Sequence, residues 1–249
     1  MGTFAKRRDN FKSFTHPLKQ IQPTQTNNVP NSCMKVPLPL ILGSNSPTRS
    51  LILSQLGIPF EKRVISIDEK AIGDRICDDP FDLVTAVAIA KANKLVEAIE
   101  SKEISLPPTC SLTDGFGVCI LTADQVVVCA GKILEKPESL DEAKAFASMY
   151  AISPASTHGA MVLTHLPSKL QFTATDTATV RFSESLLQEA DSLVAKLGDE
   201  CLSCAGGMMV ENEHVSKYIT SIDGDIDSVM GLSKKNVLEL LSRMGDKLV

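Results

Sequence analysis

The sequence lacks any run of about eighteen or more apolar residues, which is the length a helix needs to cross a bilayer. The residues after Met1 also lack the apolar core of a secretory signal. We therefore expect no membrane partner and no export, and predict a cytoplasmic protein. A G-x-G-x-x-G motif is missing after the first predicted strand, which argues against a dinucleotide-dependent dehydrogenase.

A surplus of positive charge is missing as well, because 25 Lys and Arg residues stand against 30 Asp and Glu residues, for a net charge of -5. Sequence-independent binding to a nucleic acid polymer needs clustered Lys and Arg, so no such partner is expected. The seven cysteines include one C-x-x-C, Cys201 and Cys204, and no second pair completes a zinc site. These two residues are predicted to be ordinary reduced, packed thiols.

Residues 1–36 differ in composition from the rest of the chain. They are rich in Ser, Thr, Asn, Gln and Pro, and six basic residues stand against the single acid Asp9. Such a segment cannot bury enough apolar area to order itself, so a disordered tail is one interpretation. A transit segment for a plastid or mitochondrion is the other, although no amphipathic Arg-rich helix is visible. Residues 37–249 are predicted to form the folded domain.

Strand and helix patterns alternate along the predicted domain. Ser46 is a natural N-cap, Pro47 suits the first helical position and Gly57 suits the C-terminal cap, which predicts a helix between them. Ala130-Gly131 is typical of a hairpin turn. The other expected strands cover 36–43, 60–67, 117–129, 160–164 and 174–182, and the other expected helices cover 82–100, 139–149, 184–197 and 234–244. This alternation predicts an α/β fold.

The polar turn after the first predicted strand has the composition of a phosphate site. Backbone N–H groups at a helix start, together with the helix dipole, favour an anion there. Ser44 and Ser46 would add hydroxyl groups, and Arg49 a fork-shaped cation. A capped helix without any ligand would show the same Ser-Pro pair, so this motif needs support from other residues.

That support comes from charged residues next to other predicted strands and helices. Glu69 and Asp124 each lie beside an apolar strand, where their oxygens would suit a hard divalent cation. Lys91 and Lys136 are candidate cations that would offset the charge of a polyphosphate. Each residue alone is compatible with a solvated surface role. Together they favour a metal-assisted phosphoanhydride site.

Several motifs in this order resemble the Maf family of nucleotide pyrophosphatases, over about residues 38–244. They are LILGSNSPTR (40–49), IDE (67–69), AKA (90–92), ADQVV (123–127), GKILEKP (131–137), CAGG (204–207) and VMGL (229–232). The resemblance implies an elongated α/β fold with a mixed sheet and two lobes flanking a cleft, similar to the inosine triphosphate pyrophosphatases. It also implies cleavage between the α- and β-phosphates of a nucleoside triphosphate, in a monomer or homodimer.

The resemblance implies residue roles too. Asp124 matches the proton acceptor that activates water, and Glu69 matches the acid associated with a divalent metal (Mg²⁺, Mn²⁺ or Co²⁺), which Asp124 would share. Ser44, Arg49, Lys91 and Lys136 match residues that contact the triphosphate, and Ser46 lies in the same motif as a further candidate phosphate contact. A metal-assisted attack by water needs an oriented water and neutralised phosphate oxygens, which agrees with these roles.

Three positions bear on the substrate. Gln125 and Glu211 resemble the family branch associated with 7-methyl-GTP rather than the branch associated with dTTP and UTP, and a carboxylate at 211 suits the donors on a guanine edge. Thr48 departs from that branch, which carries Trp there, so an aromatic platform for the base is missing. The alternative function is a non-catalytic nucleotide-binding regulator of cell division. Retention of both acids argues against it, because a mere binder gains little from acids beside a triphosphate.

Overall fold

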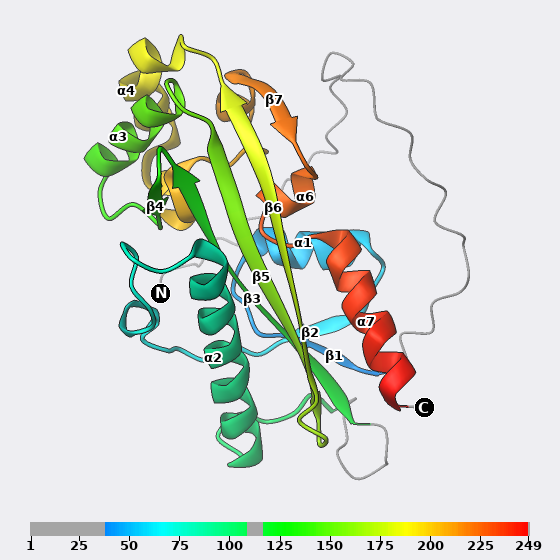
Figure 1. Ribbon diagram of the computed structural model, residues 1–249. Helices are drawn as coiled ribbons and strands as arrows, with labels where there is room; N and C mark the ends of the chain where they lie inside the picture. Colours follow the sequence, from blue (N-terminus) through cyan, green and yellow to red (C-terminus); the bar gives the residue numbers. More distant parts are fainter. Residues whose placement is uncertain (1–37, 109–116, 249) are drawn as a thin grey trace, which may run out of the picture. The chain divides into compact units, whose positions relative to one another are not determined.

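The computed structural model describes residues 38–108 and 117–248 (Figure 1). The segment 1–36 lies outside these ranges, so its interpretation as a tail or transit segment stays a prediction. In the described ranges the chain forms a mixed sheet with helices packed against it, which confirms the predicted α/β class. No helix in this part of the chain is long and apolar enough to cross a membrane.

The sheet has seven strands in the described ranges, with the order β2-β1-β3-β5-β6-β7 and with β4 paired to β3. Strand β1 is parallel to both of its neighbours, and every other pairing is antiparallel. The strands are β1 (Leu40–Leu42), β2 (Phe60–Lys62), β3 (Val118–Cys129), β4 (Lys132–Leu134), β5 (Ala155–Leu166), β6 (Gln171–Phe182) and β7 (Ile219–Asp223). The three long strands β3, β5 and β6 form its centre (Figure 1).

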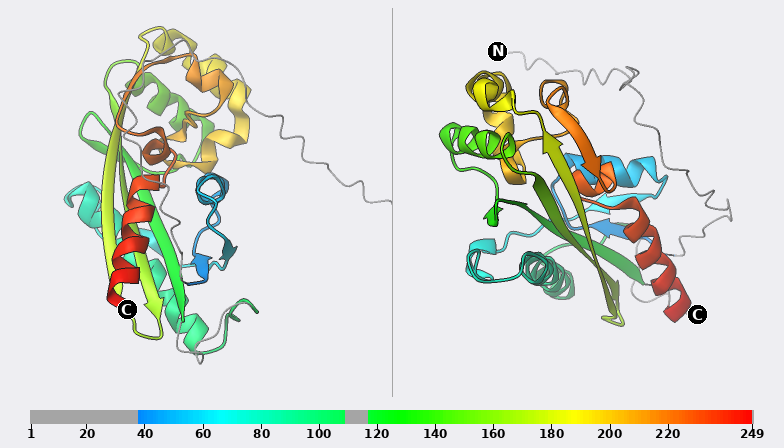
Figure 2. Two further views of the ribbon diagram at one scale, coloured as in Figure 1. Left: turned by 90° about the vertical axis from the view of Figure 1, so that its right-hand side faces the viewer. Right: turned by 45° about the horizontal axis from the view of Figure 1, so that its top comes forward.

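Helices cover both faces of the sheet. The α-helices are α1 (Pro47–Gln55), α2 (Pro80–Glu100), α3 (Leu140–Tyr150), α4 (Leu186–Leu197), α5 (Glu213–Ser216), α6 (Ile226–Val229) and α7 (Lys234–Leu248), and the 3₁₀ turns are η1 (Glu69–Ala71), η2 (Gly198–Ser203) and η3 (Ala205–Gly207). Helices α2 and α7 pack on opposite faces (Figure 2). Helices α3 and α4 pack together near one end of the long strands (Figure 1).

The alternation of side chains along β3 decides which helix each residue meets. Val118 and Ile120 pack with α2, whereas Cys119 and Leu121 pack with α1 and α7. Because strand side chains alternate between faces, the even-numbered residues of β3 point towards α2 and the odd-numbered ones point away from it. Two consecutive residues of this strand therefore lie on opposite faces of the sheet.

Local signals were confirmed more often than element lengths. Ser46 caps α1, Pro47 opens it, and Ala130 and Gly131 form the predicted turn between β3 and β4 with φ values of 50° and 75°. The strand predicted at 60–67 was too long, since β2 ends at Lys62. Its partner β1 has only three residues, so the rest of the segment finds no strand to pair with. Helix α2 begins earlier than predicted, because Asp79 caps it and accepts from the N–H of Phe81.

Candidate active site

Asp124 lies in the middle of β3, opposite Ala160 of β5. As an even-numbered residue it points towards α2, on the same face as Thr122, whose hydroxyl donates to the carbonyl of Ala88 at 2.8 Å. Only 15% of the Asp124 side chain is exposed. A carboxylate is thus held against the covered face of the sheet, where it needs charged or hydrogen-bonding partners.

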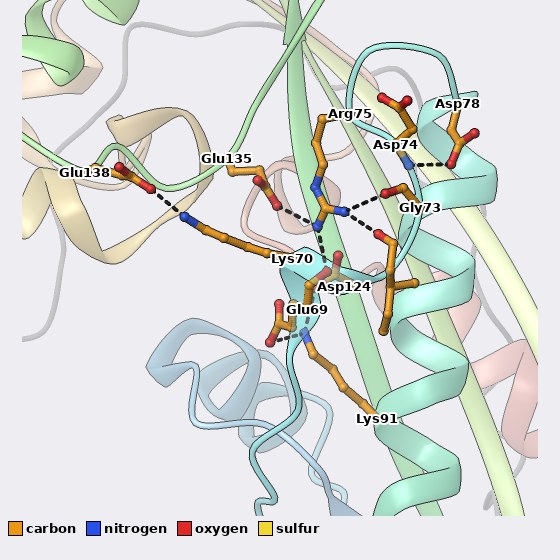
Figure 3. Close-up of polar contacts among 11 residues, drawn as sticks. Glu69, Lys70, Gly73, Asp74, Arg75, Asp78, Lys91, Asp124, Glu135 and Glu138 are labelled. Atoms are coloured by element: carbon orange, nitrogen blue, oxygen red, sulfur yellow. Dashed lines mark hydrogen bonds and ion pairs between the residues drawn. The ribbon is translucent and has the colours of Figure 1, made fainter.

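Lys91 of α2 supplies that partner. Its Nζ lies 2.7 Å from Oδ1 of Asp124 and 3.0 Å from Oε1 of Glu69, so one ammonium group bridges two carboxylates (Figure 3). The Lys91 side chain is 16% exposed, and that of Glu69, on η1, is 48% exposed. The structure therefore brings together three of the residues predicted from the sequence, with Glu69 on the side open to solvent.

Burial and charge act on Asp124 in opposite directions. Desolvation raises the pKa of Asp124 above its ordinary value, and the nearby charge of Glu69 adds to this effect. The cationic groups of Lys91 and Arg49 lower the pKa and offset part of the shift. An aspartate with a raised pKa accepts a proton more readily than an exposed one, which suits a general base.

The turn between β1 and α1 is organised by its hydroxyl groups. Ser44 is buried, and its Oγ accepts from the N–H of Ser46 at 3.2 Å. The Oγ of Ser46 accepts from the N–H of Arg49 at 3.3 Å and contacts the hydroxyl of Thr48 at 2.8 Å. These bonds cap the first turn of α1 and engage all three hydroxyl groups within the turn. Contact of Ser44 and Ser46 with phosphate and a specificity role for Thr48 stay predictions.

Arg49 connects this turn to the strand that carries Asp124. Its Nη1 donates to the carbonyl of Ala123 at 2.8 Å and to Oγ of Ser44 at 3.4 Å, and its Nε donates to the carbonyl of Gly231 at 2.9 Å. Desolvation lowers the pKa of Arg49, while the charges of Asp124 and Glu69 raise it. The guanidinium stays protonated and contributes positive charge beside the carboxylate pair.

Gln125 lies on the face opposite to Asp124. Its Nε2 donates to the carbonyl of Ser228 at 2.7 Å, and a Cβ atom placed on Gly231 would lie 3.2 Å from its Oε1. The side chain thus holds α6 against the sheet and lies close to the turn that follows it. The side chains of the neighbouring residues 124 and 125 therefore contact different elements on opposite faces of the sheet. A specificity role for Gln125 stays a prediction.

Lys136 and Glu211 lie near a different residue, Cys204. The pKa of Cys204 is raised to about 12 by burial first and then by the charge of Glu211, whereas Lys136 lowers it. Desolvation also raises the pKa of Glu211. Lys136 is exposed, and no ion pair joins it to Glu69 or Asp124 within residues 38–108 and 117–248. Cys201 and Cys204 are free thiols, one buried and one partly buried, as predicted.

Arg75 was missed by reasoning from the sequence. Its Nη2 donates to the carbonyl of Glu69 at 2.8 Å and pairs with Oε1 of Glu135 at 3.1 Å, while Nη1 donates to the carbonyl of Ile72 (Figure 3). It follows Asp74 in a polar loop, where an arginine is typical of a solvated surface. No local pattern pointed to its carbonyl partners, because the fold brings them to it.

The carboxylate pair fits an open site for a hard cation. Among the described residues, no group of three or more His, Cys, Asp and Glu side chains could hold a metal ion by itself. Mg²⁺ does not need such a cage, because it is commonly bound by one or two carboxylates together with water and phosphate oxygens. Glu69 and Asp124 match that pattern, whereas a closed structural zinc site would need four protein ligands.

Comparisons with known proteins agree with the motifs. The family model described as Maf-like protein matches residues 39–244. A 7-methyl-GTP pyrophosphatase from Dictyostelium discoideum is 32% identical over 83% of this chain and 97% of its own length. A nucleoside triphosphate pyrophosphatase from Rhodococcus erythropolis is 29% identical over 83% and 92%, and a dTTP/UTP pyrophosphatase from Salinibacter ruber is 26% identical over 85% and 93%.

Proposed function

Because this chain belongs to the Maf-like protein family, we propose that it hydrolyses a nucleoside triphosphate to the nucleoside monophosphate and pyrophosphate. The observation that carries the proposal is the largely buried carboxylate of Asp124, bridged by Lys91 to the more exposed Glu69. The names of the relatives support the same reaction, since all those compared are triphosphate pyrophosphatases.

In the proposed reaction, water attacks the α-phosphorus, and the bond from this phosphorus to the oxygen that bridges the α- and β-phosphates breaks. The carboxylate of Asp124 takes the proton from the water, and pyrophosphate leaves. The raised pKa of Asp124 makes it a stronger base than an exposed carboxylate. Lys91 and Arg49 bring positive charge to the place where negative charge accumulates on the phosphate oxygens.

Glu69 and Asp124 are the residues that would hold the divalent metal, and Mg²⁺, Mn²⁺ and Co²⁺ are the candidate ions. Such an ion, when bound with the triphosphate, neutralises phosphate oxygens and makes the phosphorus easier to attack. Lys91 now contacts both carboxylates. Its ammonium would shift towards the phosphate oxygens as the carboxylates become occupied, because a cation prefers the unneutralised anion.

We further propose that the base is a modified guanine such as 7-methylguanine. The relative from Dictyostelium discoideum named 7-methyl-GTP pyrophosphatase supports this choice. Glu211 would accept the N1–H and N2–H donors of the guanine edge, and its charge would suit the positive methylated ring. Glu211 is exposed, so its carboxylate is accessible to an incoming base, although partial desolvation raises its pKa.

One experiment tests the chemistry and the substrate together. Release of pyrophosphate and of orthophosphate is measured over canonical, methylated and other modified triphosphates, with each candidate metal. We expect pyrophosphate alone, the highest kcat/KM for 7-methyl-GTP, and a loss on the order of 10²–10⁴-fold for Asp124→Asn, the range typical of removing a general base.

Two outcomes would contradict these proposals. An Asp124→Asn protein as active as the parent would remove Asp124 from the reaction. Preference for dTTP or UTP would refute the guanine assignment while leaving the reaction class intact. Nucleotide binding without turnover under all three metals would instead favour the non-catalytic regulator.

A further inference from the structure

Two chain segments, one of which carries Glu69, are joined by side-chain contacts between residues far apart in the sequence. One is the 69–75 segment, which contains η1 and Glu69. The other is the 135–138 segment between β4 and α3, which contains Lys136. Arg75 pairs with Glu135, and Lys70 pairs with Glu138 (Figure 3). The first segment therefore carries a predicted metal ligand, Glu69, and the second a predicted phosphate contact, Lys136, and each also carries two residues that pair with the other segment.

The two connecting pairs differ in burial. Arg75 and Glu135 are 21% and 39% exposed, whereas Lys70 and Glu138 are 74% and 73% exposed. Exposed ion pairs contribute little, because water and salt screen them and two long side chains must be ordered. The Arg75–Glu135 pair is thus the stronger connection, and the Lys70–Glu138 pair provides a natural comparison for it.

Arg75 also binds the backbone of its own segment. One nitrogen, Nη2, donates both to the carbonyl of Glu69 at 2.8 Å and to Oε1 of Glu135 at 3.1 Å, so a single group joins the two segments. Nη1 donates to the carbonyl of Ile72, and Nε is buried without a hydrogen-bond partner among the described residues. A guanidinium can hold several acceptors in one plane, which an ammonium cannot do.

The loop that carries Arg75 is itself ordered by aspartates. Oδ2 of Asp78 accepts from the N–H of Asp74 at 2.7 Å, and Oδ1 of Asp74 accepts from the N–H of Ile76 at 2.8 Å. The 135–138 segment is held as well, because the N–H of Gly206 donates to the carbonyl of Glu135 at 2.9 Å. Arg75 thus connects two segments, the loop at 74–78 and the 135–138 segment, that are each held by other hydrogen bonds.

We propose that Arg75 is a positioning residue that fixes Glu69 over Asp124 and holds Lys136 at a set distance from both. The proposal rests on the proposed function, since the reaction is what would use this geometry. Arg75 would not touch the substrate, and it would act through the backbone of Glu69 and through the carboxylate of Glu135. Misplacing catalytic groups by about 1 Å costs on the order of 10²-fold in rate.

Four proteins test the proposal: the parent, Arg75→Met, Arg75→Lys and Lys70→Met. The last variant is the control, because it removes the exposed pair between the same two segments. Backbone amide exchange is followed over residues 69–75 without nucleotide, and kcat and KM are measured for the triphosphate that the parent turns over best. The exchange measurement does not depend on catalysis.

We expect the amides of residues 69–75 to exchange about tenfold faster or more in Arg75→Met, which loses hydrogen bonds made by a charged group. We expect kcat/KM to fall on the order of 10²-fold, mainly through kcat, because a displaced Glu69 weakens binding of the transition state. Arg75→Lys should recover less than half of the exchange protection. Lys70→Met should change either quantity less than about threefold.

A second comparison tests whether Arg75 acts through the 135–138 segment. Lys136→Met should reduce kcat/KM less in the Arg75→Met protein than in the parent, because the lysine is already displaced there. Additive losses of kcat/KM in the double variant would contradict the proposal. Equal losses of kcat/KM in Arg75→Met and Lys70→Met would also contradict it, as would unchanged amide exchange of residues 69–75 in Arg75→Met. A parent protein that releases no pyrophosphate would contradict the proposed function instead, and the exchange rates would still decide whether Arg75 holds the segment.

Discussion

At the scale of single residues, the site depends on a balance around Asp124. Burial against α2 raises the pKa of its carboxyl group, and Lys91 at 2.7 Å lowers it. A fully exposed aspartate would be a weaker base, and a buried one without a cation would stay protonated over a wider pH range. Lys91 thus keeps the base ionised in a place where substrate and water can be ordered.

This balance predicts the pH dependence of activity. Because Asp124 must lose its proton to act as a base, kcat/KM should rise with pH through its raised pKa. Lys91→Met removes the nearest cation and leaves desolvation less opposed, so the acidic limb of the profile should move to higher pH. The measurement is kcat/KM against pH for both proteins.

The control for this prediction lies on the same helix. Lys94 of α2 is 51% exposed and pairs with Glu97, away from the carboxylate pair. Lys94→Met should leave the acidic limb where it is in the parent. A limb that stays in place in Lys91→Met, or moves to lower pH, would show that Asp124 is not the base whose titration limits the rate.

At the scale of elements, the turn after α6 lies next to two predicted site residues, Arg49 of α1 and Gln125 of β3. Gly231 has a φ of 98°, and its carbonyl accepts from Nε of Arg49. A Cβ atom there would lie 3.2 Å from Oε1 of Gln125 and 3.5 Å from Nε of Arg49. Glycine is therefore favoured both by the backbone conformation and by the close approach of the Gln125 side chain.

Gly231→Ala should lower the free energy of unfolding by about 1–3 kcal/mol, the cost of a side chain in a strained backbone conformation. It should also lower kcat/KM, because Gln125 must shift and the strained turn also carries the carbonyl that binds Arg49. Gly57→Ala is the matched control, since Gly57 has a φ of 68° with nothing within 4 Å of an added Cβ. Urea unfolding and steady-state kinetics measure both quantities. Full activity in folded Gly231→Ala would show that the conformation of this turn does not affect the reaction.

At the scale of the whole molecule, the long strands connect all parts of the core. Strands β3 and β5 each contribute residues to all four hydrophobic clusters of the described ranges. The cluster around α3 and α4 shares these strands with the clusters around α2 and α7. Loss of packing in one cluster should therefore weaken the strands that support the others, which favours cooperative unfolding.

Leu163→Ala tests this cooperativity, because Leu163 lies in the central strand β5 and is 1% exposed. The free energy of unfolding should fall by about 2–5 kcal/mol, as is typical of buried Leu to Ala changes. Leu51→Ala, at a position that is 45% exposed on α1, should change it by less than about 0.5 kcal/mol. Two separate transitions in urea, followed by circular dichroism and by amide exchange, would contradict a single cooperative unit.

The sequence by itself determined the local features whose causes are local. Ser46, Pro47 and Gly57 predicted where α1 begins and ends, because capping depends on neighbouring backbone groups. Ala130 and Gly131 predicted a turn for the same reason. The motifs also predicted that Glu69, Lys91 and Asp124 belong to one site, and their side chains do meet.

Only the tertiary structure decided what depends on distant partners. Strand β2 ends at Lys62 because β1 offers it only three residues, which no pattern within residues 60–67 could show. The pairing of β3 with its neighbours placed Asp124 and Gln125 on opposite faces, although they are consecutive in the chain. Arg75 became a central contact because its acceptors include Glu135, 60 positions along the chain. Hydrogen bonds and ion pairs over such separations form only when the whole sheet has brought the segments together.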